Sequence, residues 1–252
     1  MCSPRRPSSV PAPSDPVRRM LKIGHRGAAG HAPENTLAAI RKGIALGVDF
    51  VEIDVRCTAD GVLVVLHDST VNRTTNGKGP IDRLSFRDVK ALDAGNGESV
   101  PTLEEALREL AGRTGLMVEL KVKGISRRTV EVVQACGFRK PVIYASFLHE
   151  ELSIIRSIDA QASIMPLFGR LPRAPVVRAM KYRPSHVGLR HDTISRRLVE
   201  AFHDQDILVC VYTADKKRDI ERACSAGVDG IISNVPERVD NVPLWNLPSS
   251  VV

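Results

Sequence analysis

Apolar and acidic residues alternate along residues 50–55, Phe-Val-Glu-Ile-Asp-Val. Side chains alternate between the two faces of a strand, so Glu52 and Asp54 share one face while the aliphatic residues share the other. Two neighbouring carboxylates repel each other unless a cation or a proton lies between them. Taken alone, this stretch fits either the polar edge of an ordinary strand or half of a metal-assisted acid/base site.

The same stretch continues through a turn into a second apolar run. Asp60-Gly61 is a tight-turn signal, and the run Val62–Leu66 ends on His67-Asp68. A histidine that follows an apolar run close to two carboxylates is a candidate general acid or base.

Apolar runs and amphipathic segments alternate along the rest of the chain. We expect eight strands, at about residues 21, 50 and 115 and over 141–147, 161–167, 186–190, 206–212 and 229–232. The helical patterns between the later strands cover 126–136, 148–158, 174–182, 195–203 and 215–225. Strands that alternate with helices imply a parallel sheet, and eight is the number of a (β/α)₈ barrel. The fold prediction is therefore α/β, a TIM barrel over residues 21–252.

Two segments depart from this alternation. Residues 67–100 carry turn signals such as Asn76-Gly77 and one short helical stretch, and they predict a small insertion after the second strand. Thr102 followed by Glu105 predicts a capping box at the start of the next helix. Residues 1–20 are rich in Pro, Ser and Arg and lack an apolar segment, which predicts a disordered basic leader and not a secretory signal.

Composition narrows the classes of function. The chain has 252 residues and a formal net charge of +7, but aromatic residues make up 4% and interleave with no basic run, so we expect no nucleic-acid binding. No apolar run approaches the ~20 residues of a membrane helix, so we expect no stable membrane insertion. The five cysteines are scattered without a Cys-x-x-Cys pair, which favours a reducing compartment and a cytoplasmic location. Both a monomer and a homodimer remain open.

Candidate ligand-binding residues follow the first and third strands. His25 and Arg26 stand directly after the first strand, at the edge where parallel α/β folds bind ligands. Asn35 or Thr36 is the N-cap of the following helix. Glu119 and Lys121 share one face of the strand at 115. They form either a neutralised pair or, with the upstream carboxylates, a cation site and a phosphate contact.

Short motifs in a fixed order resemble one family when taken together. They are Gly24-His25-Arg26-Gly27, Pro33-Glu34-Asn35-Thr36, Glu52-x-Asp54, Leu66-His67-Asp68 and Val100-Pro101-Thr102-Leu103. The set resembles the glycerophosphodiester phosphodiesterase family, a phosphodiesterase barrel of the phosphatidylinositol-phospholipase-C-like type. The resemblance implies a (β/α)₈ barrel with an inserted segment after its second strand. It also implies hydrolysis of small-molecule phosphodiesters with a divalent cation.

The resemblance also implies roles for individual side chains. Oxygen donors without sulfur or nitrogen favour Mg²⁺ or Ca²⁺, with Mn²⁺ as a further option, over zinc. Which histidine is the acid stays open. The expected roles are metal ligands for Glu52, Asp54 and Glu119, acid/base catalysis for His25 and His67, phosphate binding for Arg26 and Lys121, and support for Asn35 and Tyr212.

Two positions depart from the family's pattern. Tyr212 stands where the family commonly has Trp, and Asn234 stands where it commonly has Asp. Tyr212 keeps an aromatic face and Asn234 is still able to cap a helix, so the departures bear on the alcohol end of the substrate.

The predicted function is metal-dependent hydrolysis of glycerophosphodiesters, such as glycerophosphocholine or glycerophosphoethanolamine, to glycerol 3-phosphate and an alcohol. This would serve glycerol and lipid metabolism. A lysophospholipase D-type activity on lysophospholipids is the alternative, and it would favour an exposed apolar lip around the site. A non-catalytic phosphate-binding barrel would lack one of the site residues, and an aldolase or enolase-like barrel would carry its acidic residues further along the chain.

Overall fold

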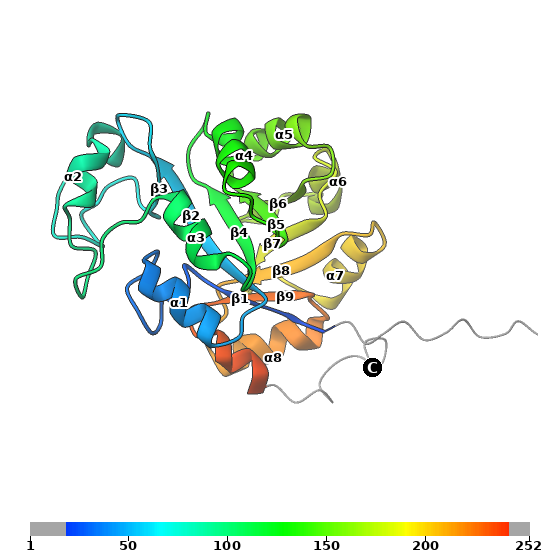
Figure 1. Ribbon diagram of the computed structural model, residues 1–252. Coiled ribbons are helices and arrows are strands. Elements are labelled where there is room, and N and C mark those ends of the chain that lie inside the picture. The colour runs from blue at the N-terminus through cyan, green and yellow to red at the C-terminus, as the bar shows by residue number, and fades with distance from the viewer. Residues whose placement is uncertain (1–18, 242–252) are drawn as a thin grey trace, which may run out of the picture.

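The structure, a computed structural model, describes residues 19–241. Among these, eight parallel strands close into a barrel, because β1 (Leu21–Gly24) pairs with both β2 (Phe50–Cys57) and β9 (Gly230–Ser233) (Figure 1). The strands between them are β4 (Gly115–Leu120), β5 (Val142–Ser146), β6 (Ser163–Phe168), β7 (His186–Arg190) and β8 (Leu208–Tyr212). The predicted TIM barrel is confirmed.

Helices cover the outside of the barrel, and their ends carry the expected caps. Thr36 accepts a hydrogen bond from the backbone of Ala39, so Thr36 and not Asn35 is the N-cap of the first helix. Thr102 and Glu105 form the predicted capping box. The helices are α1 (Leu37–Ala45), α3 (Leu103–Leu110), α4 (Ser126–Ala135), α5 (His149–Ile158), α6 (Pro175–Met180), α7 (Arg196–His203) and α8 (Lys217–Ala226), and a 3₁₀ turn, η2 (Pro236–Asn241), follows β9.

Apolar side chains fill the inside of the barrel, so it is a packed core and not a pore. Met117, Met165 and Leu167 are the largest members of this inner cluster and are nearly fully buried. Two larger clusters pack the outer faces of the strands against the helices. Polar groups therefore have room only at the strand ends, above the inner cluster.

A ninth strand was not expected from the sequence. β3 (Leu63–Val65) runs antiparallel to the end of β2, with Val65 opposite Val55. Sequence reasoning had recognised the turn at Asp60-Gly61 and the apolar run after it but had given that run no place in the sheet. The hairpin carries the chain back towards the middle of β2, and His67 follows directly.

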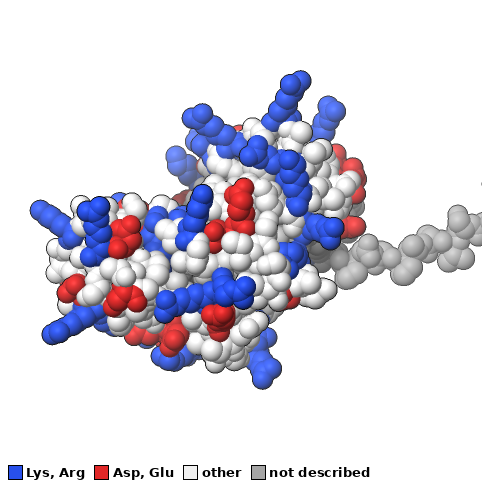
Figure 2. Space-filling view, turned by 90° about the horizontal axis from the view of Figure 1, so that it is seen from above, with Lys and Arg blue, Asp and Glu red and all other residues white. Residues whose placement is uncertain are grey.

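The segment after β3 builds a small lobe beside the barrel, on the left in Figure 1. It contains a 3₁₀ turn, η1 (Ile81–Arg83), and a short helix, α2 (Phe86–Lys90). Seen from above in Figure 2, lobe and barrel lie side by side, and Lys and Arg side chains project from both. The lobe has its own apolar cluster, formed by Val64, Leu66, Val71, Ile81, Val89, Ala94 and Val100.

The predicted leader lies outside the described residues except for its last two positions. No helix within residues 19–241 is long and apolar enough to cross a membrane.

Candidate active site

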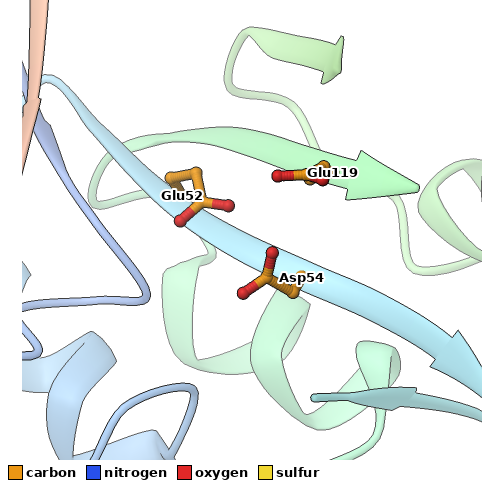
Figure 3. Close-up of side chains that lie close together, drawn as sticks. All are labelled: Glu52, Asp54 and Glu119. Atoms are coloured by element: carbon orange, nitrogen blue, oxygen red, sulfur yellow. The ribbon is translucent and has the colours of Figure 1, made fainter. Parts of the chain in front are cut away.

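Three carboxylates meet at the mouth of the barrel. Asp54 on β2 lies opposite Glu119 on β4 in the strand register, and Glu52 stands two residues earlier on the same face of β2. One oxygen from each lies within 4.8 Å of the others (Figure 3). All three side chains are nearly fully buried, with Asp54 only 1% exposed. The alternation seen in the sequence thus brings the predicted ligands together.

Burial and mutual repulsion disturb the ionisation of this cluster. Burial, together with Asp54 and Glu119, raises the pKa of Glu52 well above its usual value. The same causes raise the pKa of Glu119 to about 7. Burial opposes ionisation of Asp54 as well, but Lys121 and Arg26 outweigh it and lower the pKa of Asp54. Three neighbouring carboxylates resist being ionised together unless a positive charge compensates them. A hard divalent cation bound by oxygen ligands supplies that charge, so the residues fit the expected metal ion.

The two expected phosphate-binding cations lie against the carboxylates. Lys121 Nζ is 2.6 Å from Glu119 Oε1 and 3.2 Å from Asp54 Oδ1. Arg26 Nε is 3.3 Å from Asp54 Oδ2, and its Nη1 is 2.6 Å from Glu34 Oε1. An ammonium has three N–H donors and a guanidinium has five, so each cation keeps donors for an anion. Lys121 is therefore an ion-pair partner that also borders the site.

The backbone that presents these groups adopts a rare conformation at two non-glycine residues. Arg26 has φ 50° and Asn35 has φ 59°. Such left-handed conformations cost about 1–3 kcal/mol and are retained where their surroundings fix them. The Arg26 amide donates to Glu52 Oε2 at 2.8 Å. Asn35 Nδ2 donates to Asp54 Oδ2 at 2.8 Å, and Asn35 Oδ1 accepts from the Asp54 amide. The strained turn thus holds two of the three carboxylates.

The protonation of His25 follows from its neighbours. Asn234 Nδ2 lies 2.7 Å from Asp215 Oδ2, and because a carboxylate only accepts, the amide must donate there. Asn234 Oδ1 therefore faces His25 Nδ1, at 2.7 Å, and that nitrogen carries the proton. Burial, with Arg26 nearby, lowers the pKa of His25 to about 4. His25 is thus neutral, with Nε2 as an acceptor 4.0 Å from Glu52 Oε2.

His67 has a different partner. Its Nδ1 lies 2.6 Å from Asp68 Oδ1, so it donates to a carboxylate and not to an amide. Arg73 binds both Asp68 and Glu34, at 2.7–3.0 Å. The Arg73 guanidinium holds the pKa of Asp68 well below its usual range. Burial lowers the pKa of His67, while the negative charges of Asp54 and Asp68 oppose that shift. Asp68 therefore remains charged behind the ring and supports its protonated form.

Sequence reasoning missed several of these partners. Asp68 stood next to His67 in a recognised motif, so its role could have been inferred. Asp215 and Arg73 left no local signal, because their contacts form only in the folded chain. Asn234 was considered only as a helix cap, yet its side-chain atoms bind His25 and Asp215.

A small pocket with an apolar floor adjoins the carboxylates. His25, Glu52 and Glu119 are among its lining residues, together with Phe147 and Tyr212. The two rings pack edge to face with centroids 5.9 Å apart. The Tyr212 hydroxyl is buried and has no hydrogen-bond partner among residues 19–241. Burial raises the pKa of Tyr212, so the hydroxyl is a neutral donor. A buried donor without an acceptor fits a pocket that receives a polar ligand.

The chain resembles known proteins over most of its length. Residues 25–238 match the sequence model of the Glycerophosphoryl diester phosphodiesterase family. A Glycerophosphodiester phosphodiesterase of Caldanaerobacter subterraneus is 35% identical, over 89% of this chain and 98% of that protein. A phosphodiesterase of Oleispira antarctica, solved with the product sn-glycerol-3-phosphate, superposes with a TM-score of 0.83 at 27% identity, over 88% and 95% of the two chains. A glycerophosphodiester phosphodiesterase of Agrobacterium tumefaciens superposes with a TM-score of 0.77 at 30% identity, over 88% and 99%.

From the carboxylate cluster we expect that a metal ion stabilises the protein more strongly at higher pH. Because the pKa of Glu119 is raised to about 7 and that of Glu52 is also raised, the metal-free fold resists losing protons that the unfolded chain releases near pH 4. The stability of the metal-free protein should therefore fall as pH rises from about 4, where the unfolded carboxyls ionise, to about 7, the pKa of Glu119. A metal ion at a hundredfold excess over Kd should add about 2.7 kcal/mol. At one fixed metal concentration the gain in Tm should be larger at about pH 8 than at about pH 5, because protons compete with the metal ion for the carboxylates.

Glu52→Gln tests whether this behaviour belongs to the cluster. In EDTA the variant should melt at or above the wild-type temperature, because glutamine cannot ionise and so never adds a repelling charge to the cluster, and Mg²⁺ or Ca²⁺ should no longer raise its Tm. Glu104→Gln is the matched control, since Glu104 is exposed and paired only with Arg108, and its metal response should equal that of wild type. A Glu52→Gln protein that is destabilised in EDTA would instead indicate a structural carboxylate.

Proposed function

The chain belongs to the glycerophosphoryl diester phosphodiesterase family and is a phosphodiesterase; we propose that it hydrolyses glycerophosphodiesters to glycerol 3-phosphate and an alcohol with a divalent metal ion. Glycerophosphocholine and glycerophosphoethanolamine are representative substrates. The observation that carries this proposal is that three buried carboxylates and two histidines lie together at the mouth of the barrel. One histidine is hydrogen-bonded to an amide and the other to a carboxylate. The relative solved with sn-glycerol-3-phosphate supports the product.

We assign the metal ion to Glu52, Asp54 and Glu119, and Mg²⁺ or Ca²⁺ fits these oxygen donors better than zinc does. A cation of this kind offsets the negative charge of a phosphodiester and makes its phosphorus more open to attack. Asn35 keeps Asp54 in place through two hydrogen bonds. Arg26 and Lys121 contribute their remaining N–H groups to the phosphate oxygens, and the planar fork of Arg26 suits two of them at once.

The partners of the two histidines support different roles. His25 is neutral, with Nδ1–H held by an amide and Nε2 open, so it is the general base. It takes the proton of the attacking hydroxyl as the new P–O bond forms. If that hydroxyl belongs to water, glycerol 3-phosphate forms at once; if it belongs to the substrate's own glycerol, a cyclic phosphate forms, and water must then open it to give glycerol 3-phosphate. His67 is backed by the charged Asp68, which supports an imidazolium, so it is the general acid. It gives its proton to the alcohol oxygen as the old P–O bond breaks.

Other readings have less support. A lysophospholipase D-type enzyme needs an apolar lip for an acyl chain, yet Leu84, Phe86 and Leu92 of the lobe are only partly exposed and pack on the lobe's own core. Phe147 is 44% exposed, and it alone of the exposed large hydrophobic residues lines the described pocket at the site. A binding protein without catalysis would not need a base and an acid with contrasting partners.

Product release from purified protein tests the proposal directly. Glycerophosphocholine and glycerophosphoethanolamine should each yield glycerol 3-phosphate, EDTA should abolish the release, and added Mg²⁺ or Ca²⁺ should restore it. Lysophosphatidylcholine should be turned over much more slowly. Full activity in EDTA, or no release from either glycerophosphodiester, would contradict the proposed function.

The two histidines should respond differently to the leaving group. His25→Ala and His67→Ala should each lower kcat on glycerophosphocholine by about 10²–10⁴-fold while the metal-induced gain in Tm is kept. A glycerol p-nitrophenyl phosphodiester releases an alcohol that needs no proton, so His67→Ala should lose at least about tenfold less on it than on glycerophosphocholine. His25→Ala should lose the same factor on both substrates. The reverse pattern would exchange the two roles.

Removing the hydroxyl of Tyr212 should separate stability from activity. Tyr212→Phe removes a buried donor that has no partner in the free protein, so the variant should be as stable as wild type or more stable, by up to about 1 kcal/mol. Its kcat/KM should fall by about tenfold, because the substrate loses one hydrogen bond in a water-poor pocket. Tyr182→Phe is the control and should leave kcat/KM unchanged, since Tyr182 packs against His149 away from the pocket. An unchanged kcat/KM in Tyr212→Phe would show that the hydroxyl does not meet the substrate.

A further inference from the structure

A second hollow lies between the lobe and the loop that follows β4. Its volume is about 510 Å³, which is within the range of small-molecule sites. The lobe contributes Ser69, Thr70 and Asp82, and the barrel contributes Arg56 from β2 and Lys123 from the loop after β4. We call this hollow the lobe groove. It is separate from the small pocket beneath the carboxylates, because the two share no lining residue.

The lobe groove begins where the carboxylate cluster ends. Arg56 stands two residues beyond Asp54 on β2, so it occupies the same strand face about 7 Å further along. Lys123 lies in the turn after β4, two residues beyond Lys121. Arg56 Nε donates to the backbone oxygen of His67 at 2.8 Å. Arg56 thus links the groove to the backbone of the proposed general acid, and we expect the leaving alcohol to extend into the groove.

Most of the polar side chains of the groove are open to a ligand. Within residues 19–241 the side chains of Ser69, Thr70, Asp82 and Lys123 take part in no hydrogen bond, whereas Arg56 donates to the His67 backbone and Thr58 donates to Asp60. Arg56 and Lys123 donate hydrogen bonds and Asp82 accepts them. The hydroxyls of Ser69 and Thr70 both donate and accept. Such a mixed set matches a ligand whose groups also donate and accept.

The charges of the groove distinguish between head groups. A quaternary ammonium would face Arg56 and Lys123, and no aromatic ring in the described lining offers the face that binds such a cation. A strongly anionic group would face Asp82. The hydroxyls of a polyol donate to Asp82 and accept from Arg56 and Lys123, so they satisfy both kinds of group at once.

We propose that the lobe groove binds the alcohol part of the substrate and that the enzyme prefers diesters whose alcohol is a polyol, such as glycerol or inositol, over choline. This inference rests on the proposed phosphodiesterase function and narrows it. Arg56, Lys123 and Asp82 are the specificity-determining residues, and the carboxylate cluster and histidines act on every diester alike.

The test compares kcat/KM on glycerophosphoinositol, glycerophosphoglycerol and glycerophosphocholine with one metal ion throughout. Wild type should favour the two polyol diesters by about tenfold or more, which is the effect of one or two well-placed hydrogen bonds. Lys123→Ala should reduce that preference by about 5–10-fold, mainly through KM. Lys123→Glu should reduce it further, because the new carboxylate attracts choline. Lys140→Ala is the matched control, since Lys140 is an exposed lysine before β5, and the preference should stay as in wild type.

Binding without turnover gives a second measurement. In a His25→Ala background, calorimetry with glycerophosphoinositol should show a Kd about 5–10-fold weaker when Lys123→Ala is added, and glycerophosphocholine should show no such loss. Equal kcat/KM on all three diesters, or a preference that Lys123→Ala and Lys123→Glu leave intact, would overturn the groove assignment while the phosphodiesterase function stands. No release of glycerol 3-phosphate from any diester would overturn both.

Discussion

The burial of three carboxylates at one barrel mouth is the constraint to which the rest of the site responds. Glu52, Asp54 and Glu119 come close because β2 and β4 are neighbours in register, and nothing in that pairing relieves their repulsion. Lys121 and Arg26 offset part of the charge, and protons held by Glu52 and Glu119 offset another part. Because these contacts and protons offset only part of the charge, the cluster suits the divalent cation proposed for it.

The two histidines acquire opposite characters from a single difference in their partners. An amide oxygen accepts from His25 Nδ1 and carries no charge, so an imidazolium there would have no carboxylate hydrogen-bonded to that nitrogen. Asp68 accepts from His67 and is kept anionic by Arg73, so a proton on that ring is compensated. The departure from the family pattern at Asn234 is therefore chemically meaningful, because an aspartate in its place would make the partners of the two rings alike. In the proposed mechanism the hydrogen-bond partners distinguish the acid from the base, while burial lowers the pKa of both rings.

The elements and caps that depend on residues close in the sequence could be predicted from the sequence. Alternation fixed the face of Glu52 and Asp54, helical spacing and turn signals located the barrel strands and helices, and the Thr102–Glu105 spacing identified a cap that the structure has. Most of the unpredicted contacts depend on distant segments meeting. Asn234 is 209 residues from His25, and its orientation is set by Asp215, so no window of sequence contains that network. The place of β3 in the sheet was missed for a related reason, since a three-residue run carries too little periodicity to show its pairing partner.

The lobe and the barrel contribute different residues to the site. It supplies no carboxylate to the described cluster, yet it holds Asp68 through Arg73, and the same guanidinium binds Glu34 of the barrel at 2.7 Å. That cross-link fixes the lobe relative to the mouth while the backbone of His67 is held from below by Arg56. Changes in Ser69, Thr70 or Asp82 would then alter which alcohol fits without moving the carboxylates, because β2 and β4 position those independently. On this proposal the strands supply the three carboxylates, and the segment inserted between them supplies His67 and one side of the alcohol site.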